Sequence, residues 1–286
     1  MKKITKLTRS ALGAVSAVVL AGTAVGTALA GEALENAKKN GYIRVGFANE
    51  APYGYANASG KLTGEAPEVA KAILSKMGIK EVDGVLTEFG ALIPGLKAGR
   101  FDIIAAGMYI NPKRCKQINF SEPSYGIGQA FLVKDGNPSG LTDFAAVAAK
   151  PDAKLAVLAG AVESGYAKDS GVKQAQLVIL PDQASLAKAV QAGRADAAAL
   201  SALSVANVAS KIDGLSSTEP FGTVAGNSVK GHGGFGFRIE DEDLRNEFNK
   251  HLVTFLGSEE HLSLVTPLGF GSGYLPNKTK AELCTE

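Results

Sequence analysis

The chain has 286 residues, a formal net charge of +2, two cysteines and three histidines. A charge so near neutrality gives no basic surface for nucleic acid or for an acidic membrane. Two distant cysteines and scattered histidines are too few ligands for a metal centre, and we expect no cofactor. No low-complexity tract or repeat of solenoid length occurs, so the length predicts one large or two medium domains.

The first thirty residues have the three parts of a secretory signal peptide. Four basic residues precede an apolar run from Ala11, which ends in an A-x-A pattern at residues 28–30. This pattern predicts a signal peptide over residues 1–30. A membrane anchor is the alternative, but Gly, Ser and Thr within the run make it weakly apolar for that role. Removing four basic residues and no acid would change the formal charge of +2 to −2.

Strands and helices are then predicted in alternation. A β-rich run at 42–48 is followed by an amphipathic helix at 65–78, in which Val69, Ile73 and Met77 recur four residues apart. Further on, the pattern predicts a strand at 82–89, a short helix at 91–99 and a buried strand at 101–107. Such alternation predicts a largely parallel sheet.

The same order restarts in the second half. Strands are predicted at 153–160, 176–181 and 195–202, with a helix at 185–194, and "AVQAGRADAAAL" repeats the earlier "GLKAGRFDII". A late segment, "GGFGFRI", precedes a charged amphipathic helix at 241–256. Two similar halves with a return segment predict a bilobed α/β protein. Ligands of such folds bind between the domains, near the carboxyl ends of strands.

Both cysteines, Cys115 and Cys284, would lie in an oxidising compartment if the signal peptide is used. An even pair there predicts one disulfide, and two unpaired thiols are the alternative.

Several phrases in order resemble one family. "GYIRVGFANEAPY", "LTGEAPEVAKAILSKMG", "LIPGLKAGRFDIIAAGMYINPKRCKQINFSEPSY", "LVILPDQASLAKAVQAGRADAAAL" and "GFGFRIEDEDLRNEFNKHL" cover nearly all of residues 41–256. They resemble the solute-binding proteins of ABC importers for polar amino acids. "NEAPY", "EFGALIPGL", "PKRC" and "KTKAELC" are most similar to ectoine- and hydroxyectoine-binding proteins, which also have a cysteine after the arginine and another near the C-terminus.

This resemblance implies a periplasmic-binding-protein fold, with two α/β lobes joined by two hinge strands around a ligand cleft. Lobe 1 would comprise residues 31–125 and 234–286, and lobe 2 residues 126–233. The implied protein is a periplasmic monomer that binds a small zwitterionic solute and delivers it to the membrane permease subunits of an ABC importer.

The resemblance also implies roles for particular residues. Arg114 would grip a carboxylate with its planar guanidinium, a surface charge being the alternative. Tyr53, Phe89 and Tyr109 would form an aromatic box and Glu50 its acid, which suits the delocalised cation of ectoine. The alternatives are three core aromatic residues and a solvated loop charge.

Two departures from the family pattern concern the second half of the chain. Ser201 stands near the place of the aspartate that holds the α-ammonium of amino acids, which argues against ordinary amino acids. In "LAGAVESG", Val162 replaces an expected hydroxyl residue, so only the backbone N–H groups of Ala161 and Val162 could serve the carboxylate. Glu163 follows. The exact solute therefore stays open, and a betaine, a proline derivative or another amino acid is the alternative.

Enzymes also use this fold, notably periplasmic dehydratases of cyclic carboxylates. Arg114, Glu50 and Glu163 could form a carboxylate clamp with a general acid. The sequence has no Ser–His–acid or Cys–His set, so we expect a binding protein and no catalysis.

Overall fold

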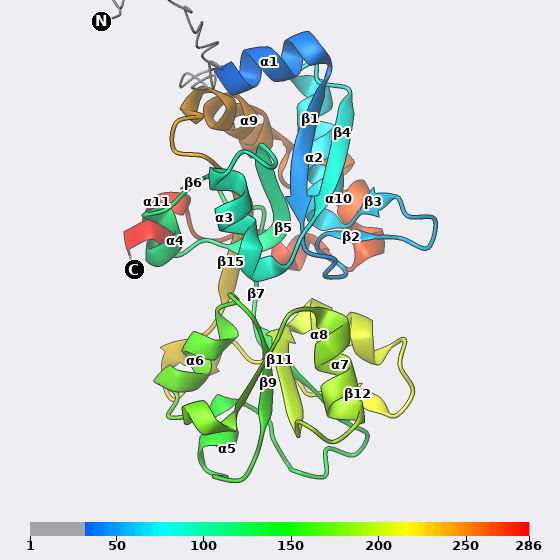
Figure 1. Ribbon diagram of the computed structural model, residues 1–286, viewed down its shortest axis with the longest axis vertical. Coiled ribbons are helices and arrows are strands. Elements are labelled where there is room, and N and C mark those ends of the chain that lie inside the picture. Colours follow the sequence, from blue (N-terminus) through cyan, green and yellow to red (C-terminus); the bar gives the residue numbers. More distant parts are fainter. Residues whose placement is uncertain (1–31, 286) are drawn as a thin grey trace, which may run out of the picture.

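The computed structural model describes residues 32–285 and consists of two α/β lobes, one above the other in Figure 1. Each lobe is built around one large β-sheet. The bilobed α/β architecture is therefore confirmed. The predicted signal peptide, residues 1–30, lies outside the described residues, and the lobe boundaries at 125/126 and 233/234 stay a prediction.

The first sheet has the strand order β4-β1-β5-β15-β6, with β7 paired to β15. Strand β1 is parallel to β4 and β5, whereas β15 runs antiparallel to β5, β6 and β7. The strands are β1 (Tyr42–Phe47), β4 (Glu81–Leu86), β5 (Ile103–Tyr109), β6 (Asn119–Phe120), β7 (Tyr125–Ile127) and β15 (Gly231–Phe237).

The helix predicted at 65–78 shows how the sequence pattern produces an element of this lobe. It is α2 (Glu65–Lys76), whose residues Val69 and Ile73 are completely buried, and Gly78 follows it with a φ of 85°. The other elements are α1 (Glu32–Asn40), β2 (Tyr55–Ala56), β3 (Leu62–Thr63), η1 (Phe89–Ala91), α3 (Leu92–Lys97), α4 (Pro112–Cys115), α9 (Glu242–Phe255), α10 (Glu259–Val265), η3 (Thr266–Leu268), η4 (Ser272–Tyr274) and α11 (Lys280–Thr285).

Several strands are shorter than predicted, and one of these differences changes the position of a predicted site residue. The strand predicted at 82–89 ends at Leu86, and the N–H of Thr87 donates to the carbonyl of Phe47. The chain then turns into the 3₁₀ helix η1, which begins at Phe89. Phe89 therefore begins a short helix beyond the end of the strand and is not part of the sheet.

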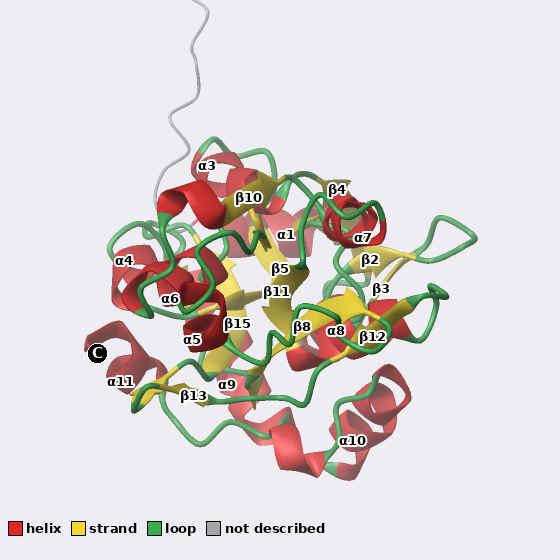
Figure 2. Ribbon diagram, turned by 90° about the horizontal axis from the view of Figure 1, so that it is seen from below, coloured by secondary structure: helices red, strands yellow, loops and turns green. Residues whose placement is uncertain are grey.

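The second sheet has the order β10-β9-β11-β8-β12. Strands β9, β10 and β11 are parallel, whereas β8 is antiparallel to β11 and β12. Helices α5 and α6 lie on one side of the strands, and α7 and α8 on the other (Figure 2). The elements are β8 (Gln129–Lys134), α5 (Phe144–Ala148), β9 (Leu155–Leu158), α6 (Glu163–Asp169), η2 (Gln174–Gln176), β10 (Leu177–Leu180), α7 (Gln183–Gln191), β11 (Ala197–Ser201), α8 (Ala202–Ala209), β12 (Leu215–Ser217), β13 (Thr223–Val224) and β14 (Asn227–Ser228).

The chain passes between the lobes in two extended segments. On the way out, β7 ends in the first sheet at Ile127 and β8 begins in the second sheet at Gln129. On the way back, the chain leaves the β13–β14 hairpin and joins the first sheet as β15 from Gly231. Strands β7 and β15 lie at the junction in Figure 1. These two segments therefore join the lobes, and the cleft lies beside them.

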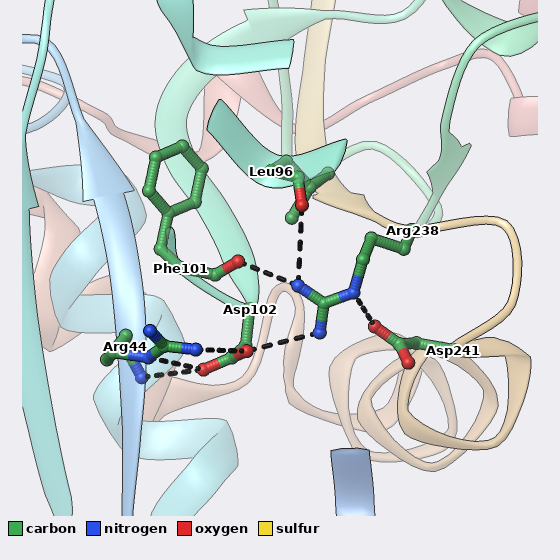
Figure 3. A network of polar contacts seen from close by, with 6 residues as sticks. All are labelled: Arg44, Leu96, Phe101, Asp102, Arg238 and Asp241. Carbon is green, nitrogen blue, oxygen red and sulfur yellow. Dashed lines mark hydrogen bonds and ion pairs between the residues drawn. The ribbon is translucent and has the colours of Figure 1, made fainter. Parts of the chain in front are cut away.

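An ion-pair network holds the end of the first sheet that is remote from the cleft (Figure 3). Asp102, which precedes β5, pairs with Arg44 of β1 and with Arg238, which follows β15, each at 3.1 Å. Arg238 also pairs with Asp241 at 2.6 Å and donates to the carbonyl of Phe101 at 2.8 Å. The network thus ties the neighbouring strands β1, β5 and β15 together at one end of the sheet.

A disulfide joins Cys115 of α4 to Cys284 of α11, as the cysteine pair predicted. The two cysteines are 169 residues apart in sequence. The bridge therefore holds the C-terminal helix against the short helix that carries Arg114.

Candidate functional site

The candidate site is a cavity between the two lobes, where the carboxyl ends of strands from both sheets meet. The space between protein atoms here amounts to about 330 Å³, part of which is open to solvent. The eight residues predicted to bind ligand all line it, from lobe 1 (Glu50, Tyr53, Phe89, Tyr109, Arg114) and from lobe 2 (Ala161, Val162, Ser201). Their role in binding stays a prediction. The cavity is also lined by Gly107, Tyr125, Leu158, Glu163 and Leu200, which were not predicted as ligand residues.

Arg114 is held in place by the short helix α4. The side chain of Asn111 caps this helix by accepting the Arg114 N–H at 2.9 Å. The guanidinium donates from Nη1 to the Tyr109 carbonyl at 2.7 Å and from Nη2 to the Gly160 carbonyl at 3.0 Å. It lies 5.5 Å from the centre of the Phe89 ring. These contacts orient a buried cation whose remaining N–H donors can receive a carboxylate.

Burial and the nearby acid have opposite effects on the pKa of Arg114. Burial lowers the pKa of the guanidinium, and the nearby Glu163 carboxylate is the largest influence that raises it. Because arginine keeps its proton in proteins, the site retains a permanent positive charge. The surface-charge alternative does not fit this side chain, since only 6% of Arg114 is exposed.

The aromatic residues form a connected group at the lobe 1 wall. Tyr53 packs on Tyr125 with ring centres 5.0 Å apart and on Phe270 at 5.2 Å, and Tyr109 lies 6.3 Å from Tyr125. The Tyr125 hydroxyl donates to the Gly107 carbonyl at 2.7 Å. Tyr125 therefore lines the cavity and also packs against two residues of the predicted box, a role that sequence reasoning missed.

Glycines in the neighbouring strands make room for these rings. A Cβ atom on Gly107, where φ is 64°, would lie 2.4 Å from the Tyr53 ring, and a Cβ on Gly231 would lie 2.0 Å from the Tyr109 ring. Side chains cannot approach so closely, and Gly107 also has a backbone conformation that favours glycine. The glycine-rich "GHGGFGF" strand was therefore a signal of the aromatic cluster that it packs against.

Two buried acids face the cavity from opposite lobes. Glu50 accepts a hydrogen bond from the Ser204 hydroxyl at 2.6 Å, and burial raises its pKa to about 7. Burial also raises the pKa of Glu163 to about 7, with a further increase from the charge of Glu50 and a decrease from Arg114. One permanent cation and two titratable acids therefore surround the same space.

Three contacts close the lobes over the cavity, besides the Glu50–Ser204 bond. The Gln183 side chain exchanges two hydrogen bonds with the backbone of Ala51, and Arg114 donates across the cleft to Gly160. Gly160 approaches Gly90 so closely that a Cβ on Gly160 would lie 2.6 Å from the Gly90 Cα. The structure is thus a closed form, and a solute in the cavity would be enclosed by both lobes.

Residues 43–264 match the family of bacterial extracellular solute-binding proteins, family 3. The chain belongs to this family.

Relatives of this family 3 protein include binding components of importers. A probable amino-acid ABC transporter periplasmic-binding protein, y4tE of Sinorhizobium fredii, is 37% identical over 259 residues, which covers 88% of this chain and 86% of the relative. The lysine/arginine/ornithine-binding periplasmic protein of Escherichia coli is 28% identical over 221 residues, which covers 73% of this chain and 80% of the relative.

Two solved structures are also similar. EhuB in complex with hydroxyectoine has a TM-score of 0.82 and 34% identity, covering 89% of this chain and 98% of the other. The ancestral amino acid-binding protein AncCDT-1, a precursor of cyclohexadienyl dehydratase, has a TM-score of 0.72 and 29% identity, covering 82% and 98%. Both likenesses extend over the two lobes.

Within residues 32–285 of this family 3 protein, no three His, Cys, Asp or Glu side chains gather in a way that could hold a metal ion. The same residues contain no helix that is long and apolar enough to cross a membrane. The cavity itself combines the buried Arg114 guanidinium, aromatic walls and two acids.

Proposed function

We propose that this family 3 protein binds ectoine or hydroxyectoine in the periplasm and delivers it to the permease subunits of an ABC importer. The observation that carries the proposal is the placement of Arg114 and Glu50 on one aromatic-walled cavity. A carboxylate can bind the free N–H donors of Arg114 while an amidinium meets Glu50 and the faces of the aromatic rings. The likeness to EhuB with hydroxyectoine supports this choice of solute.

Closure of the lobes supports delivery by an importer. The bound solute would be covered by both lobes, so the shape of the closed protein reports its occupancy to a membrane partner. We expect the protein to act as a monomer without a cofactor. Its periplasmic location rests on the predicted signal peptide and on the extracellular family to which it belongs.

A panel of solutes tests the proposal. The purified protein without residues 1–30 is titrated calorimetrically with ectoine, hydroxyectoine, glycine betaine and the common L-amino acids, and thermal unfolding is followed in parallel. A true ligand raises the melting temperature by mass action. We expect the ectoines to give the largest shifts. Tight binding of an ordinary amino acid together with no response to either ectoine would contradict the proposed solute.

The dehydratase alternative has one observation in its favour. Glu50 and Glu163 both have pKa values raised to about 7, which suits a general acid, and they lie on the cavity with Arg114. We expect binding without conversion. Proton NMR of the solute after prolonged incubation with the protein, at stoichiometric and at catalytic concentrations, should show it unchanged; a new vinylic or aromatic product would favour the enzyme.

A further inference from the structure

Glu163 has no part in the proposed carboxylate clamp or aromatic box, yet it lies on the same cavity. It is the first residue of α6 and follows the loop that leaves β9. Only 5% of the residue is exposed, and its Oε2 atom has no hydrogen-bond partner among the described residues. A buried carboxylate oxygen of this kind is costly unless a donor reaches it.

The neighbouring cation does not supply that donor. Arg114 directs Nη1 and Nη2 to the carbonyls of Tyr109 and Gly160, and none of the ion pairs within residues 32–285 joins it to Glu163. Glu50, on the opposite lobe, is already bonded to Ser204. Glu163 is thus an acceptor on lobe 2 that remains available to a molecule in the cavity.

We propose that Glu163 determines specificity by accepting a hydrogen bond from an N–H group on the cationic end of the solute. This inference rests on the proposed function, since it assumes that the carboxylate of the solute occupies Arg114. The cationic end then meets Glu50 from lobe 1 and Glu163 from lobe 2. A solute whose cation carries N–H groups satisfies both acids.

A fully alkylated cation cannot do the same. A quaternary ammonium is attracted by aromatic rings, so the walls of the cavity would accept it. It has no hydrogen to donate, so Glu163 would stay buried without a partner, and a missing partner in a desolvated site is strongly selected against. The site should therefore prefer amidinium and N–H-bearing ammonium carboxylates to betaines.

The test compares solutes and variants in calorimetry. The probes are ectoine, glycine betaine and the ring-matched pair L-proline and its N,N-dimethyl betaine. Glu163→Gln keeps the size of the side chain but removes the charge, and the exposed lobe 2 residue Glu219 supplies the control Glu219→Gln. Because hydrogen bonds to charged groups contribute substantially, we expect Glu163→Gln to weaken ectoine about tenfold or more. Betaine affinities should change by less than about twofold, so the preference for ectoine over betaine should be largely lost.

A second variant keeps the test decisive if Glu163→Gln folds poorly. Glu163→Asp withdraws the acceptor and the charge by one methylene, so it should weaken ectoine more than betaine and reduce the preference for N–H-bearing cations. An ectoine-to-betaine affinity ratio that is the same in the parent, Glu163→Gln and Glu163→Asp would overturn the proposal while leaving the proposed function intact. Tight binding of proline that depends on Glu163, with no ectoine binding, would instead overturn the proposed solute and support the role of Glu163.

Discussion

Gln183 of lobe 2 pairs with the backbone of Ala51 in lobe 1 through both ends of its side-chain amide. Its Oε1 accepts the Ala51 N–H at 3.2 Å, and its Nε2 donates to the Ala51 carbonyl at 2.8 Å. Neither residue lines the cavity. The pair therefore favours the closed arrangement of the lobes without contacting the solute.

Gln183→Ala should weaken solute binding by shifting the protein toward the open form. Two neutral hydrogen bonds of ordinary strength correspond to roughly a five- to hundredfold loss of affinity. Gln191→Ala, at the exposed end of the same helix, is the control and should leave the affinity unchanged. Calorimetry gives the affinity, and small-angle scattering should show a larger radius of gyration for ligand-free Gln183→Ala. Identical affinities for the two variants would contradict a role in closure.

Arg114→Ala should weaken any carboxylate solute by about 2–5 kcal/mol, because the bound carboxylate would be desolvated without a partner. Arg114→Lys should recover only part of this loss, since a point charge cannot reproduce the two-pronged donor. The lysine variant also loses a contact between lobes, because Nη2 donates to Gly160. Calorimetric titration with ectoine measures both, and an unchanged dissociation constant for Arg114→Ala would remove Arg114 from the site.

The aromatic wall should contribute through its ring faces. Tyr53→Leu and Tyr109→Leu keep much of the apolar area but remove a cation–π contact, which in a desolvated site contributes about 2 kcal/mol, so each should cost roughly tenfold or more in affinity for ectoine. Tyr53→Phe is the matched control and should cost far less. Equal affinities of Tyr53→Leu and Tyr53→Phe would mean that the ring face at this position does not hold a cation.

Phe89→Leu should weaken solute binding mainly by changing the orientation of the Arg114 guanidinium. The Phe89 ring lies 5.5 Å from the Arg114 guanidinium, so it orients that cation as well as lining the cavity. We therefore expect the effects of Phe89→Leu and Arg114→Lys on affinity to be less than additive in a double-mutant cycle. Strict additivity would indicate that Phe89 contacts the solute independently of Arg114.

The stability of the ligand-free protein should fall as the pH rises toward neutrality. Glu50, Glu65 and Glu163 each have a pKa raised by burial from 4.5 to about 7. Since the folded protein holds these protons more tightly than the unfolded chain, their contribution is fully present below about pH 4.5 and is lost between about 4.5 and 7. Thermal unfolding from pH 5 to 8 should show a smaller decline for Glu65→Gln and Glu163→Gln than for the parent protein. An equal decline in all three would contradict the raised pKa values.

Binding of a cationic solute should follow the opposite trend. A bound cation favours the ionised forms of Glu50 and Glu163, so its affinity should rise with pH through about 7 and weaken as these acids take up protons. Glu163→Gln should flatten this profile in calorimetry across pH 5.5 to 8.5, whereas Glu65→Gln, outside the cavity lining, should not. A pH-independent affinity in the parent protein would mean that neither acid contacts the cation.

Loss of the disulfide should destabilise the protein without changing the cavity residues. Cys284→Ser releases a loop of well over a hundred residues, since the cysteines are 169 apart, and should lower the free energy of unfolding by about 2–4 kcal/mol. Denaturant titration measures this loss. The same titration of the parent protein under reducing conditions should match the variant, and an unchanged midpoint in both would show that the bridge adds no stability.

Local patterns in the sequence were sufficient for much of the architecture. The apolar spacing of Val69 and Ile73 predicted α2, and the continuous apolar run before Tyr109 predicted β5, because the periods of helices and strands are properties of neighbouring residues. The oxidising compartment implied by the N-terminal pattern predicted the pairing of Cys115 with Cys284. Resemblance to a family predicted that Arg114 and Glu50 share one site.

Contacts between the lobes followed only from the tertiary structure. Glu50 meets Ser204 over 154 residues of sequence, Gln183 meets Ala51 over 132, and Arg114 meets Gly160 over 46. Such pairs depend on how the two lobes face each other once they close. The spacing of residues along the chain does not determine that relative orientation. For the same reason Tyr125 was missed, and Glu163 was predicted only for the enzyme alternative: their positions on the cavity depend on the packing of β7 against β15 and on the place where α6 begins, which tertiary packing decides.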